Sequence, residues 1–583
     1  MKAQRPLSCV RSRKVCAAVA ALTVATTCAA SPETAVSRGA PREEAGSLSL
    51  PNRSARGKWY YRPYEYEAWM LQRMRAEADR GVRNFAYPGR FLTLTNEPAA
   101  VWSETPVPGL EPIPGEPGIP PHRAERPTVA RPLTVSGGLY DLGREDIGYV
   151  CVTSPEPPPR LFVGESRAEA ANSDTNLFEQ VTDMAPDGAG RWRSVVPLAL
   201  RYFRFAAPVA GEVSFLSQVD GREPSGRFTC SDPRLVRMWR TGVETLRLCT
   251  RTFLVDGIKR DRLPWAGDLA VEILAQAYSF GDPEPVKRTL AALGSGDPRT
   301  VGNVNGIAAF SMWWVVAHDL LQRYFGEAGY LRLHYPRIRA RMAELATHED
   351  ARGFFARDLG WNFMDWTGRD GAMLRSEISL QVIYFAALES GARLADRVGD
   401  AASAAAWRAR AARLKETILA VGMDGTRHAR ILAVALGLVD GETARRYARE
   451  IAAGDLPPTV TPYMSTFEVI ALVKGGETEA ARTKFEAVWG AMADFGVDAY
   501  WEGWDAADGD DARYVFYGRP FGKSLCHAWG SGPAFLIPGL FLGIEPAEDG
   551  WRKIRVAPRV PDFAPDAQVV IPGAGGSVRN GGQ

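Results

Sequence analysis

The segment SDPRLVRMWRTGVETLRLC, residues 231–249, decides the fold class because the hydrophobic pattern becomes helical there. Apolar or small residues recur in it at every third or fourth position, and this spacing places them on one face of an α-helix. They are Leu235, Met238, Trp239, Gly242, Leu246 and Cys249. A long helical region therefore begins at this point.

Eleven further segments downstream have the same helical character. We expect helices near residues 267–281, 284–294, 307–325, 327–346, 374–397, 400–419, 426–438, 441–453, 463–474, 478–493 and 523–540. With the first helix they make twelve, which predicts a mainly α protein. Its central domain, residues 231–545, would be an (α/α)6 toroid of six inner helices ringed by six outer ones. A helical solenoid would give a similar count and is the structural alternative.

The sequence on both sides of the helical region has β character. Residues 133–230 contain short apolar runs separated by Gly, Pro and Asp, which predicts a small antiparallel β-sandwich before the toroid. The runs are 139–142, 148–152, 201–205 and 211–215. After Gly543, runs at 551–556 and 568–571 predict a short β segment, residues 546–583, instead of a full domain.

The first 132 residues are predicted to be an export signal, residues 1–30, followed by a linker and a Pro-rich region, residues 31–132. A basic front precedes the small apolar run Val15–Ala30, which is typical of a secretory signal and too short for a stable membrane span. We therefore expect a periplasmic or extracellular protein. The segment Ala25-Thr26-Thr27-Cys28 faintly resembles a lipoprotein cleavage site, so Cys28 is a candidate lipid anchor.

Composition narrows the classes of partner. The chain has 583 residues with a formal net charge of +2, so it shows no electrostatic footprint for nucleic acid. No Cys/His spacing suggests a zinc site, and we expect neither metal nor cofactor. A helix over 235–249 would hold Cys230 away from Cys249. The four cysteines beyond the signal are therefore expected to be buried free thiols: Cys151, Cys230, Cys249 and Cys526.

The loop DGIKRDRLPWAGD, residues 256–268, is the most informative stretch for function. Three carboxylates alternate with three cations in it. Pro264 and Gly267 keep the segment out of a helix until Asp268, which is placed to cap the helix that follows. Carboxylates accept hydrogen bonds from sugar hydroxyls, and Trp265 offers a stacking face, so one interpretation is a sugar site. The structural alternative is a salt-bridged loop with a helix cap.

A second candidate is Glu502, which lies between two indoles in AYWEGWD, residues 499–505. Loops from opposite ends of a toroid sequence meet at its mouth, so Glu502 would face the acidic loop. Two facing carboxyl groups are what glycoside hydrolysis requires. The loop GWNFMDW, residues 360–366, adds an aspartate and two further indoles. His527 opens the last inner helix, where it either bonds a sugar hydroxyl or caps the helix.

These residues resemble glycoside hydrolase family 78, the α-L-rhamnosidases and their unassigned relatives. The resemblance runs from YDLGRE at 140–145, through 231–233 and the acidic loop, to WEGW at 501–504 and SLCH at 524–527. It implies a six-hairpin glycosidase that removes terminal α-L-rhamnose with inversion, using water and no metal. The partner would then be a carbohydrate.

The resemblance also implies a role for each matching residue. Asp261 falls where the family places its general acid, and Glu502 where it places its general base. The residues expected to contact the sugar are Asp256, Arg260, Trp265, Asp268, Trp314, Trp366 and His527. An inverting pair would hold its carboxyl groups roughly 6.5–9.5 Å apart, which leaves room for a water molecule.

One departure from the family concerns the acid. The family usually has Glu where this chain has Asp261, which is shorter by one C–C bond, ~1.5 Å. The loop would have to move inward, the donor would differ, or the substrate would not be a simple rhamnoside. Arg260 and Arg262 would lower the pKa of an acid that they touched, so we expect them to point toward Asp256 or the backbone.

Two other functions stay open at this point. One is an exo-glycosidase of different sugar specificity on the same toroid, acting on a uronic acid or a different deoxy-sugar. Arg and Lys near the site, such as Lys259, would suit a carboxylated substrate. The other is a non-catalytic sugar-binding lipoprotein whose acid has been lost.

Overall fold

The computed structural model describes residues 128–174, 177, 180, 182–219, 221–260, 262–294, 303–356, 363–368, 370–374, 376–510, 512–560, 562–574 and 577–579, and the paired strands β1 (Asn84–Ala86) and β2 (Thr93–Thr95). The predicted export signal, Cys28, most of the predicted linker and Asp261 lie outside the described residues. In the described part of the chain, no helix has the length and apolar character needed to cross a membrane.

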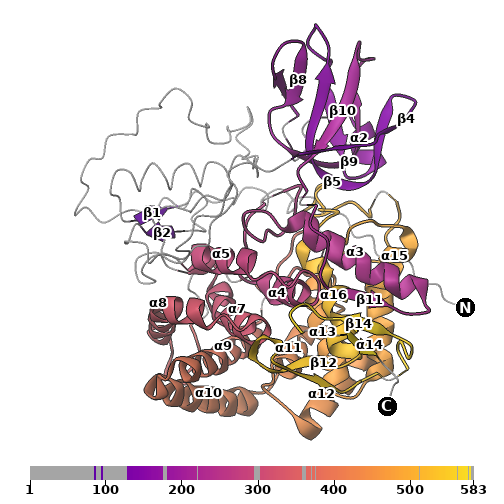
Figure 1. Cartoon of the computed structure of the whole chain (residues 1–583). Coiled ribbons are helices and arrows are strands. Elements are labelled where there is room, and N and C mark those ends of the chain that lie inside the picture. The colour runs from indigo at the N-terminus through magenta and orange to yellow at the C-terminus, as the bar shows by residue number, and fades with distance from the viewer. Residues whose placement is uncertain are drawn as a thin grey trace, which may run out of the picture. The chain divides into compact units, whose positions relative to one another are not determined.

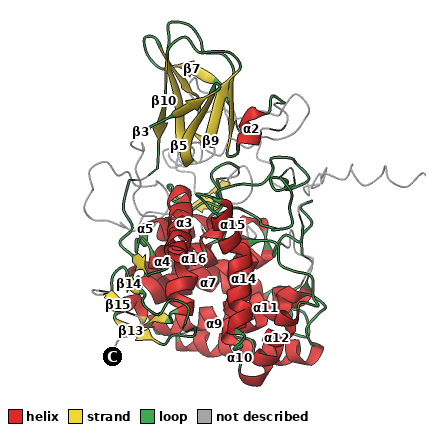
Figure 2. Cartoon of the chain, turned by 90° about the vertical axis from the view of Figure 1, so that its right-hand side faces the viewer, coloured by secondary structure: helices red, strands yellow, loops and turns green. Residues whose placement is uncertain are grey.

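The region before the helices is antiparallel β structure, as predicted (Figures 1 and 2). Its strands are β3 (Val129–Arg131), β4 (Thr134–Ser136), β5 (Leu139–Thr153), β6 (Leu161–Gly164), β7 (Met184–Pro186), β8 (Arg191–Ser194), β9 (Leu198–Phe205) and β10 (Glu212–Ser217). The predicted runs 139–142 and 148–152 belong to one long strand, β5, whose pairing with β9 shifts register between Asp141 and Asp146. Helix α2 (Arg167–Ala171) follows β6 directly.

All twelve predicted helical segments are helical in the structure. Six of them form an inner ring in which each packs against the next: α4 (Leu269–Tyr278), α7 (Ala308–Phe325), α9 (Glu377–Val398), α11 (Arg427–Ala435), α13 (Pro462–Lys474) and a broken segment. The broken segment consists of η4 (Ala528–Ser531), α16 (Pro533–Phe535) and η5 (Leu536–Phe541), and it packs against α4. The ring is therefore closed.

The other six segments lie outside this ring. They are α3 (Pro233–Cys249), α5 (Glu284–Leu293), α8 (Ala328–Ala346), α10 (Ala401–Val421), α12 (Gly441–Ala453), and α14 (Thr478–Phe485) continued by η3 (Glu486–Gly490) and α15 (Ala491–Phe495). Every residue of α4 is buried, whereas only 5 of the 21 residues of α10 are buried. A helix buried all round belongs to an inner layer, and one with a single apolar stripe belongs to an outer layer.

The C-terminal strands attach to the outside of the ring. Strands β12 (Ile544–Glu548) and β13 (Lys553–Val556) form a hairpin. Strand β14 (Gln568–Val570) pairs with β15 (Ser577–Arg579) and with β11 (Arg227–Thr229), which directly precedes α3. The predicted C-terminal β segment is confirmed as an appended strand set, and it joins the two ends of the helical region.

Candidate active site

Two interhelical loops meet through backbone hydrogen bonds. In the loop between α3 and α4, the N–H of Asp256 donates to Leu263 O at 3.1 Å. In the loop between α15 and η4, the N–H of Glu502 donates to Ser524 O at 2.9 Å. The N–H of Ala528 donates to Asp256 O at 2.6 Å and so joins the two loops. The acidic loop and the Glu502 loop are therefore neighbours, as the toroid predicted.

The Glu502 side chain is buried, at 1% exposure, and its carboxylate accepts four hydrogen bonds. Oε1 accepts from Arg260 at 2.8 Å and from the Tyr517 hydroxyl at 2.5 Å. Oε2 accepts from Arg260 at 3.1 Å and from the Ser524 N–H at 3.0 Å. The two Arg260 contacts come from one nitrogen, Nη2, so three donor groups together satisfy both carboxylate oxygens.

These contacts keep Glu502 ionised. Burial alone would raise the pKa of its carboxyl group, but the adjacent Arg260 guanidinium, with contributions from His527, the Tyr517 hydroxyl and the Ser524 N–H, lowers the pKa below its ordinary value. The sequence suggested a desolvated glutamate. The structure shows a desolvated carboxylate that is compensated by an arginine 242 residues away in the chain.

His527 is held at the same junction as a neutral ring. The ring is buried and stacks on Trp529 with ring centroids 4.1 Å apart, and the backbone N–H of His527 donates to Tyr500 O. Burial lowers the pKa of the imidazole to about 3, against a smaller raising effect of Glu502. Its side chain makes no capping hydrogen bond to η4, so the capping alternative is wrong. Nδ1 is buried without a hydrogen-bond partner and can bond a ligand hydroxyl.

The structure describes two of the three aspartates of the acidic loop, and they have different contacts. Asp256 is buried, and its Oδ1 accepts the N–H of Leu263 at 3.1 Å, so this carboxylate helps to shape the loop. Asp268 occupies the N-cap position of α4 but makes no capping hydrogen bond, so the predicted cap is wrong. Its charge, like that of Asp365, contributes to the raised pKa of Tyr463, whose main cause is burial. Asp261 lies outside the described residues.

The two arginines beside Asp261 point in different directions. Arg262 donates to the backbone carbonyls of Ile258 and, at 3.1 Å, of Pro197, which confirms the prediction that it points toward the backbone. Arg260 also donates to a backbone carbonyl, Gly522 O. The prediction was incomplete for this residue, because its main contact is the Glu502 carboxylate.

Two of the predicted aromatic residues lie near the junction, and the third is interior. Trp366 is half-buried, and its ring lies edge-on to Tyr517 at 5.1 Å. Trp265 is half-buried against Phe310. Trp314 is 1% exposed, and its indole N–H donates to Leu290 O at 2.8 Å, between α7 and α5. This is the packing of a core residue, and it gives no support to the prediction that Trp314 walls a pocket.

A sequence model of the bacterial α-L-rhamnosidase six-hairpin glycosidase domain matches residues 223–537, which is more than half of the chain. The chain belongs to this family. The match spans α3 to η5 and contains both loops of the candidate site. It confirms the resemblance seen in the sequence and, with the closed inner ring, the predicted (α/α)6 toroid.

Solved rhamnosidases share the fold of this family member. The GH78 family rhamnosidase of Bacillus sp. GL1 is 23% identical, with a TM-score of 0.64 over 78% of this chain and 51% of that one. The Klebsiella oxytoca rhamnosidase with rhamnose bound is 23% identical, with a TM-score of 0.59 over 70% and 88% of the two chains. The Streptomyces avermitilis α-L-rhamnosidase complexed with L-rhamnose is 20% identical, with a TM-score of 0.60 over 78% and 47%.

The chain spans about half the length of the Bacillus and Streptomyces enzymes. No curated protein matches the chain. At these identities the solved structures establish the fold of this family member.

Residues that the sequence analysis missed also shape the site. Tyr517 lies 15 residues after Glu502 in the same loop, donates to its carboxylate, and has Arg260 over its ring at 4.4 Å. Its backbone φ of 53° is in the left-handed region, which is unusual for a residue with a side chain. The aromatic run Tyr514-Val515-Phe516-Tyr517 was the available signal.

Asp365 anchors the loop that carries Trp366. It is completely buried and accepts hydrogen bonds from Thr461 Oγ1 at 2.7 Å and from His428 Nε2 at 3.0 Å. Thr461 is also the N-cap of α13. Asp365 therefore ties this loop to the ends of α11 and α13, a structural role that its spacing in the sequence did not reveal.

The four cysteines in the described part of the chain are free thiols, as predicted, although Cys230 is only half-buried. Cys249, at the end of α3, and Cys526, beside His527, have their Sγ atoms 3.9 Å apart. The two thiols therefore lie where the start of the acidic loop meets the end of the loop that carries Glu502.

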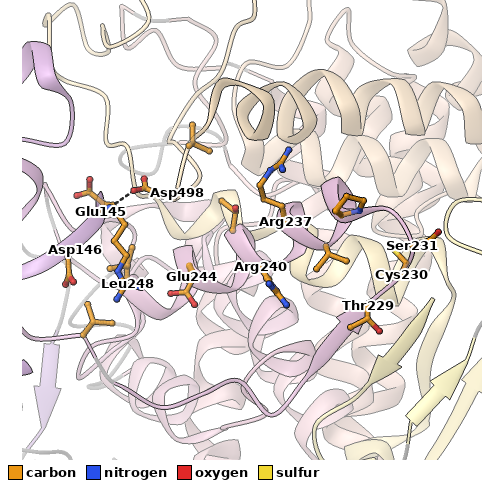
Figure 3. Close-up of a pocket in the computed structure, with 16 residues that line it drawn as sticks. Glu145, Asp146, Thr229, Cys230, Ser231, Arg237, Arg240, Glu244, Leu248 and Asp498 are labelled. Carbon is orange, nitrogen blue, oxygen red and sulfur yellow. Dashed lines mark hydrogen bonds between the residues drawn. The ribbon is translucent and has the colours of Figure 1, made fainter. Parts of the chain in front are cut away.

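A separate cavity of about 800 Å³ lies between α3 and the β region. Figure 3 shows Glu145 and Asp498 together at one end of it, where the Glu145 N–H donates to Asp498 Oδ2 at 2.7 Å. Arg237 and Arg240 of α3 lie along it. None of the predicted site residues that the structure describes lines this cavity, and it is not part of the candidate active site.

Proposed function

We propose that this protein is an exo-glycosidase that removes terminal α-L-rhamnose, or a related deoxy-sugar, with inversion at the anomeric carbon. The observation that carries the proposal is Glu502, a buried carboxylate held ionised at the junction with the acidic loop. The family match places this carboxylate inside a glycosidase domain.

In this mechanism Asp261 protonates the glycosidic oxygen, while Glu502 removes a proton from the water that attacks the anomeric carbon from the opposite face. The water would bind Glu502 beside three donor groups that already contact its two oxygens, from Arg260, Tyr517 and Ser524. The neutral imidazole of His527 supplies Nδ1 to a sugar hydroxyl.

The test of the base is Glu502→Gln. The amide cannot accept a proton from water, and general base catalysis typically contributes about 10²–10⁴-fold, so kcat on a nitrophenyl α-L-rhamnoside should fall by that factor. The matched control is Glu468→Gln, because Glu468 is also a buried glutamate paired with an arginine, Arg427, but lies on α13. Equal loss in both variants at matched folded fractions would contradict the assignment.

Stereochemistry is tested by proton NMR of the sugar released at early times. An inverting enzyme acting on an α-rhamnoside releases the β anomer first. Early α anomer would rule out the inverting mechanism while leaving the glycosidase proposal in place.

Lys259 gives no support to the uronic acid alternative. Lys259 is 1% exposed and is paired with Glu165 and Glu169, so its charge is already neutralised within the protein. A panel of nitrophenyl glycosides decides between sugars. Binding of L-rhamnose without turnover of any rhamnoside would favour the non-catalytic sugar-binding protein.

Export is a further part of the proposal, supported by the basic and apolar character of residues 1–30. Cell fractionation should find the protein outside the cytoplasm, and mass spectrometry of the mature N-terminus should distinguish cleavage near Ala29 or Ala30 from lipid attachment at Cys28.

A further inference from the structure

A buried ionic cluster joins the β region to the acidic loop. Its centre is Lys259 Nζ, which lies 3.0 Å from Glu165 Oε2 and 3.4 Å from Glu169 Oε2. All three side chains are at most 4% exposed. Lys259 Nζ also donates to Phe521 O at 3.1 Å, in the loop that precedes η4. We call Glu165, Glu169 and Lys259 the interdomain cluster.

The two glutamates are fixed by the corner between β6 and α2. The N–H of Glu165 donates to Glu169 Oε2 at 3.1 Å, and the N–H of Glu169 donates to Ser166 Oγ, the N-cap of α2. Gly164 makes this corner tight, because a Cβ there would lie 2.5 Å from Ala170 N. The carboxyl groups are thus held in place before they meet the toroid.

The cluster contacts both loops of the candidate active site. Glu165 Oε2 accepts the N–H of Leu525 at 2.6 Å, next to Ser524, whose N–H donates to Glu502. Lys259 directly precedes Arg260, which donates to Glu502 and to Gly522 O. Two groups that bind Glu502 are therefore each one residue away from a contact of the cluster.

We propose that Glu165 and Glu169 of the β region are positioning residues for catalysis, which act through Lys259 and Leu525 to hold Arg260 and Ser524 against the base Glu502. The assignment rests on the proposed glycosidase function. It makes the corner between β6 and α2 a support for the base, although no residue of the β region is placed in contact with the sugar.

Three variants test this assignment: Glu165→Gln, Lys259→Met, and the two together. A misplacement of about 1 Å at a reacting group can cost about 10²-fold in rate. We expect each single variant to lower kcat on an α-L-rhamnoside by about 10–100-fold, with the affinity for L-rhamnose changed less than about threefold. Both changes break the same ion pair, Lys259–Glu165. The fold loss of kcat in the double variant should therefore be smaller than the product of the two single losses.

The matched control is Asp146→Asn. Asp146 is a buried carboxylate of the same β region. It is paired with Arg131 at 2.9 Å and bonded to Ser217, and its hydrogen bonds and its ion pair stay within that region. It should lower the melting temperature as the Glu165 variant does while leaving kcat within about twofold of wild type. If Asp146→Asn lowers kcat as much as Glu165→Gln does, the loss reflects general destabilisation and the assignment is overturned.

Amide hydrogen exchange supplies a readout that needs no activity. Peptides covering 256–260 and 521–527 should exchange at least about fivefold faster in Glu165→Gln and Lys259→Met, and unchanged in Asp146→Asn. If wild type cleaves no rhamnoside, the proposed function fails. The hydrogen-exchange experiment still decides whether the interdomain cluster holds the two loops in place. Unchanged exchange, or multiplicative losses in the double variant, would overturn the assignment.

Discussion

Glu502 shows how one side chain can be buried and ionised together. The Arg260 guanidinium, a phenol and a backbone N–H compensate for the lost hydration, and the nearby His527 stays neutral because burial lowers its pKa to about 3. Arg260 is thus the positively charged group that contacts the Glu502 carboxylate. This pairing could not be derived from the sequence, because the partners are 242 residues apart and only the closed ring brings them together.

Tyr517→Phe tests the contribution of the phenol. The hydroxyl donates to the ionised carboxylate, so its removal should raise the pKa of Glu502. The base is active above its pKa, and activity is lost as pH falls through that pKa. The acid limb of kcat/KM should therefore move to higher pH in the variant, measured between pH 3.5 and 7.

Tyr514→Phe is the control for that experiment. Tyr514 lies in the same loop, and its ring packs against Trp501 at 5.7 Å. The charged and titratable groups that act on Glu502, namely Arg260, His527 and Tyr517, are unchanged in this control. An acid limb at the same pH in wild type and both variants would show that the hydroxyl does not tune the base.

At the scale of elements, the sequence predicted the helices well because each carries a continuous hydrophobic pattern. It was less successful where the chain interrupts its own pattern. The last inner segment begins at 528, not 523, and breaks into η4, α16 and η5, where Gly530, Gly532, Pro533 and Pro538 occur. Strand β5 was predicted as two runs because Gly143 and the charged residues around it interrupt the apolar pattern.

Packing between the inner helix α13 and the outer helix α12 is tight enough to exclude a methyl group at the end of α13. A Cβ at Gly475 would lie 2.1 Å from Ala448 Cβ of α12 and 3.0 Å from Ala444 O. Gly475→Ala should therefore lower the free energy of unfolding by about 1–3 kcal/mol, the usual cost of overpacking.

Gly329→Ala is the matched substitution with the opposite sign. A Cβ at Gly329, in the first turn of α8, meets nothing within 4 Å. This change should raise the free energy of unfolding by about 0.4–1 kcal/mol, because it restricts the unfolded chain. Urea denaturation of both variants checks the pair, and a gain of stability in Gly475→Ala would contradict the packing described here.

At the scale of the whole molecule, the interdomain cluster places two carboxyl groups around one ammonium group. Burial, reinforced by Glu165 and opposed by Lys259, raises the pKa of Glu169 to about 7. A carboxyl group with a raised pKa contributes stability that is present at low pH and lost as pH rises through the folded-state value. Ionisation of Glu169 therefore weakens the folded state between about pH 5 and pH 8.

Glu169→Gln removes this titration. The difference in unfolding free energy between variant and wild type should shift in favour of the variant by on the order of 2–3 kcal/mol from pH 5 to pH 8. Urea denaturation at four pH values measures the difference, and other titrating groups cancel in it. A pH-independent difference would show that Glu169 keeps one protonation state throughout this range.

The inner ring closes by contact between its first and last segments, and the pairing of β11 with β14 fastens the same seam. Each inner helix therefore packs against two neighbouring inner segments, and these contacts do not depend on the chain connections between helices. A single proteolytic cut in an exposed connection, such as residues 454–458 between α12 and α13, should leave the two fragments migrating together on a native gel. The fragments would separate only in denaturant. A cleaved sample would therefore look intact on a native gel and would show two fragments on a denaturing gel.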